Sequence, residues 1–408
     1  MISIAIVGVG GYGGQICRTI RTLADKGHCR LIAAADSRMS LLTEQSEQLA
    51  SEGVELYENA CEMFAELKGR CQTVSICAGV PAHLRLARAA AEAGFHIHLE
   101  KPPAPTVQDT DRITEAVQQA GVMCMLGFHK VHSRTLRFIK DAISKGKLGK
   151  INTLTAIGLL PRKWFYYTRN GWAGKLRVGN EWVLDGIATN AMCHEIHSML
   201  YLASPAPGGY ARPISIRGEL YSAWPIEGHD TAAIEIRTEE GPRALMVGSH
   251  VSEGSVQPVI TIEAEKGTAR WERHKATVTY DDGTCEQCEL DSDMREEMLL
   301  DFLNAIECKN PASLTSTCAD GRAVMVAVNA AHDSSGVIHR IPTRYLRKAG
   351  GEPEQTLTVV DHMDDYLLEA VEQRCLLSDL ESPPPWASAT RHVDASSYES
   401  FPVSFRCH

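Results

Sequence analysis

The chain has 408 residues and a formal net charge of −10, from 41 Lys and Arg against 51 Asp and Glu. This acidic balance argues against a nucleic-acid-binding surface or a polybasic membrane anchor. The 13 cysteines show no zinc-type spacing, and no run of about 18 apolar residues predicts a transmembrane helix. Because the first residues predict a strand and not a leader peptide, we expect a cytoplasmic protein with free thiols and no metal site.

Strands and helices alternate over the first 128 residues. Residues 2–7 form an apolar run typical of a strand buried on both faces, and a helix follows with Ile16, Ile20 and Leu23 on one side. Further strands are predicted at 31–35, 74–78, 95–99 and 122–128, and helices at 82–93 and 106–120, where Thr106 and Asp109 resemble a capping box. This alternation predicts an N-terminal Rossmann domain, a doubly wound parallel sheet, over residues 1–128.

Residues 129–345 have a different pattern. Helices are predicted at 133–145, 188–202, 294–307 and 318–332, and strands at 151–159 and repeatedly between 214 and 281. We expect an α+β domain with an open, mainly antiparallel sheet for substrate binding and oligomerisation. Residues 346–408 are expected to form a C-terminal extension with one helix, near 361–377, and a tail that contains Pro383–Pro385.

The first candidate site is the turn Gly8-Val9-Gly10-Gly11-Tyr12-Gly13, between a strand and a helix. Glycines there permit a tight turn, close approach of a diphosphate and close helix–strand packing. Asp36 ends the next strand. Its carboxylate is expected to accept hydrogen bonds from the ribose hydroxyls and to repel a 2′-phosphate, which favours NAD. Arg38 can instead pair with that phosphate, so NADP stays an alternative. The predicted cofactor-binding residues are Gly8, Gly10, Gly11, Tyr12, Gly13, Asp36, Ser37, Arg38, Ala78, Pro81, His83, Glu100 and Lys101.

Two further motifs carry chemistry. Glu100-Lys101-Pro102 follows the predicted strand 95–99, at the end of the sheet where ligands bind in open α/β folds. Asn190, His194 and His197 share one face of the predicted helix 188–202. A buried histidine pair or zinc ligation by His194 and His197 are alternatives for that face, although the spacing suggests no third ligand.

Together these motifs resemble the glucose–fructose oxidoreductase/inositol dehydrogenase (Gfo/Idh/MocA) family over roughly residues 2–340. The resemblance includes the glycine turn, Pro81-x-His83, Glu100-Lys101-Pro102, Gly127-Phe128, GKLGKI at 146–151 and AHDSSG near 332. The family's third motif is D-x-G-x-H-x-x-D. Here Asn190 and His197 stand in place of its two carboxylates and His194 is kept; Asp185 is a candidate for the missing carboxylate.

The resemblance implies an NAD(P)-dependent oxidoreductase that transfers a hydride between the nicotinamide and a secondary alcohol of a sugar, sugar derivative or cyclitol. His194 would act as general base, since imidazole has an ordinary pKa of about 6.5. Lys101 would stabilise the developing alkoxide, Asn190 would position the substrate or Lys101, and Pro81 and His83 would line the nicotinamide end. Substrate contacts are expected mainly from the long loop 161–183, and the predicted residues are Lys163, Trp164, Tyr166, Tyr167, Arg169, Trp172, Asp185 and His197.

Two alternatives remain at this point. A glycoside-cleaving enzyme would oxidise transiently, eliminate the aglycone and regenerate its NAD; it would need a second base, for which Tyr166, Tyr167 or His197 are candidates. A non-catalytic dinucleotide sensor would bind another protein. By analogy with the family, we expect a homodimer or homotetramer formed through the sheet of the second domain.

Overall fold

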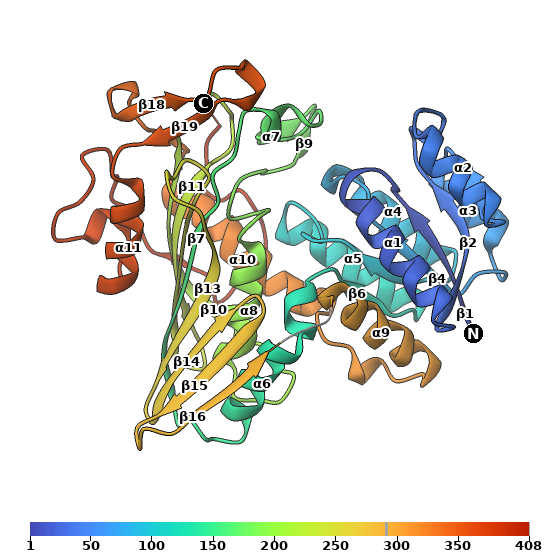
Figure 1. Ribbon diagram of the computed structural model, residues 1–408, viewed down its shortest axis with the longest axis horizontal. Coiled ribbons are helices and arrows are strands. Elements are labelled where there is room, and N and C mark those ends of the chain that lie inside the picture. The colour runs from blue at the N-terminus through green and yellow to red at the C-terminus, as the bar shows by residue number, and fades with distance from the viewer. Residues whose placement is uncertain (290–292, 408) are drawn as a thin grey trace. The chain divides into compact units, whose positions relative to one another are not determined.

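The computed structural model describes residues 1–289 and 293–407, which form two compact units (Figure 1). Unit 1 combines Met1–Ser133 with Asp291–Arg322, and unit 2 combines Arg134–Leu290 with Ala323–His408. This division differs from the predicted boundaries at 128 and 345. A helical segment from the second half of the chain returns to the first unit, and the C-terminal extension packs within the second.

Unit 1 contains a six-stranded parallel sheet in the order β3-β2-β1-β4-β5-β6, the strand order of a Rossmann fold. The order reverses between β1 and β4, and ligands of such sheets bind beyond the carboxyl ends of the strands at this point. The predicted fold class is confirmed here. The strands are β1 (Ile2–Val7), β2 (Cys29–Ala35), β3 (Glu55–Tyr57), β4 (Thr73–Ile76), β5 (His96–Leu99) and β6 (Cys124–Leu126).

The helices of unit 1 bury apolar faces beside this sheet. One core cluster combines side chains of α1, α2 and α9, including Ile16 and Ile20 from α1 and Phe302 and Leu303 from α9. This burial is the physical reason why residues after 293 join unit 1. The predicted cap of α5 is present, because Thr106 Oγ1 accepts the Asp109 N–H at 3.3 Å. The helices are α1 (Gly11–Asp25), α2 (Thr43–Ser51), α3 (Ala60–Leu67), α4 (His83–Glu92), α5 (Val107–Ala120) and α9 (Met294–Glu307).

Unit 2 is built on a ten-stranded, mainly antiparallel sheet whose main path runs β16-β15-β14-β13-β7-β12-β11-β10-β17, with β20 also pairing with β10. The predicted open sheet is therefore present. Its strands are β7 (Ile151–Leu159), β10 (Pro213–Ser222), β11 (Thr231–Thr238), β12 (Arg243–Ser249), β13 (Val256–Ala264), β14 (Gly267–Glu272), β15 (Lys275–Tyr280), β16 (Cys285–Glu289), β17 (His339–Arg340) and β20 (Val393–Asp394). Two short pairs lie outside it: β8 (Arg177–Val178) with β9 (Glu181–Trp182), and β18 (Leu346–Ala349) with β19 (Leu357–Val360).

Helices lie on both faces of this sheet (Figure 1). On one face are α6 (Arg134–Ser144), α8 (Cys193–Ala203) and α10 (Cys318–Ser335), most of which belongs to unit 2. On the other, α11 (Met363–Gln373) packs on β7 and β12, and its Leu367 and Ala370 share a core cluster with Leu159 and Leu245 of those strands. The extension thus covers part of one face of this sheet, and oligomerisation through the sheet stays a prediction.

The C-terminal tail is anchored by the buried carboxylate of Asp333, in the segment AHDSSG of α10. The backbone N–H groups of Val403, Ser404 and Phe405 donate to Asp333 Oδ1 at 3.0, 2.7 and 2.7 Å, and the Tyr398 hydroxyl donates to Oδ2. Hydrogen bonds to an ionised acceptor are stronger than those between neutral groups. One residue of the motif therefore positions the last part of the chain.

Within the described residues, no helix has the length and apolar character needed to cross a membrane. The same residues contain no group of three or more His, Cys, Asp or Glu side chains placed to hold a metal ion.

We predict that Asp333→Asn releases the tail, because an amide cannot replace the anion that accepts these donors. The expected loss is about 2–4 kcal/mol of unfolding free energy. Denaturant unfolding would measure the loss, and limited trypsin digestion would report earlier cleavage after Arg391 and Arg406. The matched control is Asp365→Asn, whose side chain is 78% exposed. Equal stability of the two variants would contradict this role for Asp333.

Candidate active site

The glycine turn of unit 1 connects β1 to α1 through a close backbone contact. Gly8 has a φ of +85°, which glycine adopts without strain, and a Cβ at Gly13 would lie 2.1 Å from the Gly8 carbonyl oxygen. Gly10 precedes α1 without a capping side chain. A Cβ built on Gly11 meets no heavy atom within 4 Å among the described residues. The space beside Gly11 is therefore open among the described residues, and the uncapped start of α1 fits the diphosphate of a dinucleotide.

Asp36 follows β2 and is oriented by the same turn. Its Oδ2 accepts the Val9 N–H at 3.0 Å and the Gly10 N–H at 3.4 Å, and its Oδ1 accepts the Arg38 N–H at 3.0 Å. These bonds leave further lone pairs on the carboxylate for ribose hydroxyls. Both Ser37 and Arg38 are exposed beside it, and Tyr12 on α1 is 39% exposed.

Glu100 and Lys101 follow β5, and the Lys101–Pro102 peptide bond is cis. The Glu100 carboxyl is buried and accepts the Lys101 N–H at 3.2 Å. Burial raises its pKa from 4.5 to about 7, although Lys101 and Arg295 act in the opposite direction. A Cβ at Gly127 would come within 2.7 Å of Glu100 Oε1. The glycine of the Gly127-Phe128 motif thus makes room for this carboxyl group.

His83, at the start of α4, links two loops at the carboxyl end of the sheet. Its Nδ1 lies 2.9 Å from the Pro102 carbonyl oxygen, and its Nε2 lies 2.9 Å from the Ala78 carbonyl oxygen. Burial lowers its pKa. Pro81 belongs to the short 3-10 turn just before it. His83 therefore fixes the backbone around Glu100-Lys101-Pro102, and the nicotinamide contact suggested for it stays a prediction.

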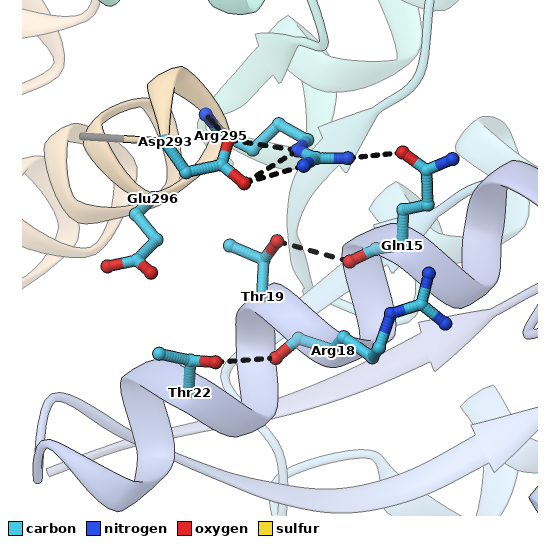
Figure 2. Close-up of a pocket in the computed structure, with 7 residues that line it drawn as sticks. All are labelled: Gln15, Arg18, Thr19, Thr22, Asp293, Arg295 and Glu296. Atoms are coloured by element: carbon cyan, nitrogen blue, oxygen red, sulfur yellow. Dashed lines mark hydrogen bonds and ion pairs between the residues drawn. The ribbon is translucent and has the colours of Figure 1, made fainter. Parts of the chain in front are cut away.

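A small polar pocket lies along the side of α1, facing the start of α9 (Figure 2). Figure 2 shows the Arg295 guanidinium held by the Asp293 carboxylate and by Gln15. The predicted site residues do not line this pocket. Its lining residues are Gln15, Arg18, Thr19, Thr22, Asp293, Arg295 and Glu296.

In unit 2, the predicted helix 188–202 begins later, as α8 at Cys193. Asn190 lies before it, where the Asn190 N–H donates to Gly186 O and the Met192 N–H to Ile187 O in a turn. The expectation that Asn190 shares a helical face with His194 and His197 is therefore wrong, because these turn bonds replace the helical pattern. His194 is the second residue of α8 and is 7% exposed.

Asp185 forms a buried cluster with Asn190 and Arg169. Its Oδ1 accepts the Asn190 amide at 3.0 Å, its Oδ2 accepts the Gly174 N–H at 2.7 Å, and the Arg169 guanidinium lies 4.0 Å from Oδ2. The Asn190 amide also lies 3.5 Å from the Tyr166 hydroxyl. Asp185 thus brings a carboxylate to Asn190, the position at which the family motif has its first Asp.

The other predicted substrate residues have different surroundings. Trp164 and Tyr167 pack with Trp224 in the core cluster that also contains apolar side chains of α11. The Tyr167 hydroxyl lies 3.1 Å from His250 Nδ1. Lys163 donates to Gln355 in the extension at 2.7 Å. Trp172 lies below the Arg169 guanidinium, 5.5 Å from the ring centroid to Cζ. His197 is fully buried, with its ring 4.8 Å from that of Tyr210.

Two residues that the sequence did not predict as site residues lie beside Tyr166, next to the Asp185 cluster. The Arg162 guanidinium lies over the Tyr166 ring, 5.0 Å from its centroid, and His250 packs edge-on to the same ring at 5.3 Å. Arg162 lies in the predicted loop 161–183, but nothing in the sequence separates it from the other Arg and Lys residues of that loop. His250 follows β12 and carried no such signal.

Comparisons with known proteins bear on both units. Residues 2–128 match the model of an oxidoreductase family with an NAD-binding Rossmann fold, GFO_IDH_MocA. These residues therefore form a domain of the Gfo/Idh/MocA type, and the match does not extend over the rest of the chain. The predicted dinucleotide-binding domain is thereby confirmed as an NAD-binding domain of this family.

Among curated relatives, the chain is 28% identical to a myo-inositol 2-dehydrogenase of Thermotoga maritima over 151 residues, 37% of this chain and 43% of the relative. It is 25% identical to a D-glucoside 3-dehydrogenase of Escherichia coli K12 over 158 residues, 39% of this chain and 43% of the relative. The matches span less than half of these relatives. A crystal structure of the WlbA dehydrogenase from Bordetella pertussis, in complex with NADH and UDP-GlcNAcA, is 22% identical with a TM-score of 0.66, covering 82% of this chain and 96% of that chain. This likeness supports the fold.

We predict that Glu100 makes the NAD-free protein less stable as the pH rises. Its raised pKa means that the folded state holds a proton that the unfolded state has lost, so stability falls between about pH 4.5 and pH 7. The free energy of unfolding of Glu100→Gln, relative to that of the wild type, should therefore rise by on the order of 2 kcal/mol between pH 5 and pH 8. Thermal unfolding at both pH values would measure the change. Glu115→Gln, a change at an exposed residue, is the control and should show the same pH dependence of stability as the wild type. The same pH dependence in Glu100→Gln would refute the prediction.

Proposed function

We propose that this protein is an NAD-dependent oxidoreductase that transfers a hydride between the nicotinamide and a secondary alcohol of a sugar, sugar derivative or cyclitol. The observation that carries the proposal is the backbone geometry at Gly8–Gly13, with Asp36 held beside it, in a domain that matches an NAD-binding family. The substrate class is supported by the similar inositol and glucoside dehydrogenases. NAD is favoured over NADP because the Asp36 carboxylate would repel a 2′-phosphate.

NAD, when bound, supplies the nicotinamide carbon that accepts or returns the hydride. The role proposed for His194 is to accept the proton of the substrate hydroxyl. The role proposed for the Lys101 ammonium is to stabilise a developing alkoxide. Asn190 positions the substrate hydroxyl. Asp185 is a positioning residue, because its carboxylate fixes the Asn190 amide at 3.0 Å. The reverse reaction uses the same groups.

The glycoside-cleaving alternative requires a second base, and the tyrosines of unit 2 are poorly suited to it. Burial raises the pKa of Tyr166 to about 12, with a further contribution from Asp185. Burial also raises the pKa of Tyr167 well above its ordinary value. Both phenols therefore stay protonated near neutral pH, which leaves the fully buried His197 as the remaining candidate for a second base.

The proposal is tested with a panel of sugars, sugar acids and inositols, each with NAD⁺ or NADP⁺, read as absorbance of the reduced cofactor. His194→Asn should lower kcat by roughly a hundredfold to ten-thousandfold, because it removes the base, while NADH affinity is unchanged. The control is His362→Asn, whose side chain is 73% exposed. Turnover with only catalytic NAD and no net NADH would favour the glycoside-cleaving alternative. Absence of NADH formation with every compound, together with intact NADH binding, would favour the non-catalytic sensor.

A second test exchanges the partners of one hydrogen bond. Asp185→Asn and Asn190→Asp should each lower kcat/KM by roughly tenfold to a hundredfold, the range expected for a lost hydrogen bond to a charged group. The double variant, which restores an amide–carboxylate pair, should recover most of that activity. No recovery in the double variant would leave Asp185 with only a structural role.

A further inference from the structure

Arg162 presents a buried donor without an acceptor. Its backbone N–H donates to the His250 carbonyl oxygen at 2.9 Å, and its guanidinium lies over the Tyr166 ring at 5.0 Å. The Arg162 Nε atom is buried and has no hydrogen-bond partner in the described part of the chain. An unsatisfied buried donor costs free energy, and a charged one costs more. A ligand that accepts from Arg162 would remove this cost.

The neighbouring arginine differs from Arg162 because it is already neutralised. Arg169 lies over the same Tyr166 ring at 3.7 Å, donates to the Tyr166 carbonyl oxygen and lies 4.0 Å from the Asp185 carboxylate. Asp185 is 4% exposed as a residue and Arg169 24% as a side chain, so the pair is largely shielded from water. Two guanidinium groups and one carboxylate leave a net positive charge around Tyr166.

A second orphan polar atom lies beside the same ring. His250 is 1% exposed, and its Nε2 has no hydrogen-bond partner among the described residues. Burial, with a smaller effect of Arg162 and Arg169, lowers its pKa well below the usual range, so the ring is neutral. When the Tyr167 hydroxyl donates to Nδ1 across 3.1 Å, the proton of the ring is on Nε2. His250 then provides a neutral donor.

We propose that the substrate is a polyhydroxylated carboxylic acid, an aldonate or a uronate, whose carboxylate binds to Arg162 with His250 Nε2 as a further donor. This inference rests on the proposed function and names its substrate class. The planar guanidinium matches a carboxylate in shape and charge. A phosphate fits less well, because it carries nearly two negative charges and the cluster offers one net positive charge beside Asp185.

The kinetic test compares acids with matched neutral compounds and with a phosphate, using NAD⁺. The acids are D-glucuronate and D-gluconate, the neutral compounds D-glucose and D-sorbitol, and the phosphate is D-glucose 6-phosphate. The wild type should prefer the acids. Arg162→Gln should lower kcat/KM for an acid by roughly tenfold to a hundredfold, mainly through KM, and should change that of neutral compounds little. Arg162→Lys should give an intermediate loss.

The matched control is Arg344→Gln, because Arg344 also stacks on a tyrosine, Tyr345, at 4.8 Å. It should leave the preference for acids unchanged. Melting temperatures of all variants show whether Arg162→Gln is folded, and Arg162→Lys supplies a second variant that keeps the charge. Isothermal titration of D-glucuronate and D-gluconate into the NADH-loaded wild type and Arg162→Gln gives a binding measurement that does not depend on turnover.

The outcomes separate this inference from the proposed function. If neutral compounds are oxidised as well as acids, and Arg162→Gln treats both alike, the substrate inference is overturned and the oxidoreductase stands. If no compound yields NADH but the acids bind the wild type and not Arg162→Gln, the proposed function fails and the carboxylate site stands. Preference for D-glucose 6-phosphate over the acids, or absence of acid binding to the wild type, overturns the carboxylate site.

Discussion

The polar cluster of unit 2 depends on one buried carboxylate. Asp185 accepts hydrogen bonds from the Gly174 N–H and the Asn190 amide and lies next to Arg169. Removing a carboxylate from water is costly unless it gains such partners. The same requirement therefore fixes the loop before Asp185, the turn before α8 and the guanidinium over Tyr166. Asp185 Oδ1 holds the Asn190 amide at 3.0 Å, five residues later in the chain.

Most of the fold could be predicted because local signals were strong. The apolar run 2–7 and the cap at Thr106 coincide with β1 and the start of α5. The return of α9 to unit 1 could not be predicted, since periodicity shows that Phe302 is buried but not that it packs with α1. The start of α8 was misplaced because Ala188–Met192 favours helix locally while its backbone bonds to Gly186 and Ile187 form a turn.

The candidate residues of the two units differ in how far the sequence predicts them. Glycines at 8 and 13 are required by backbone geometry, so the cofactor turn could be identified from residue types alone. From the sequence, Asp185 could be suggested only as a substitute for the carboxylate that the family motif has at position 190. Arg162 could not be distinguished from a solvated charge in an Arg- and Lys-rich loop, because only the structure shows that its Nε is buried without a partner among the described residues.

The C-terminal extension shares its core with the loop 161–183. Trp164 and Tyr167 pack in the same cluster as Met363 and Leu367, and the Trp164 N–H donates to the Thr356 carbonyl oxygen at 3.0 Å. Burial of these side chains thus stabilises both segments together. A chimaera that received this loop on the scaffold of a relative without the extension would expose the apolar side of the loop. The two segments consequently depend on each other for burial, although about 160 residues, 184–345, separate them along the chain.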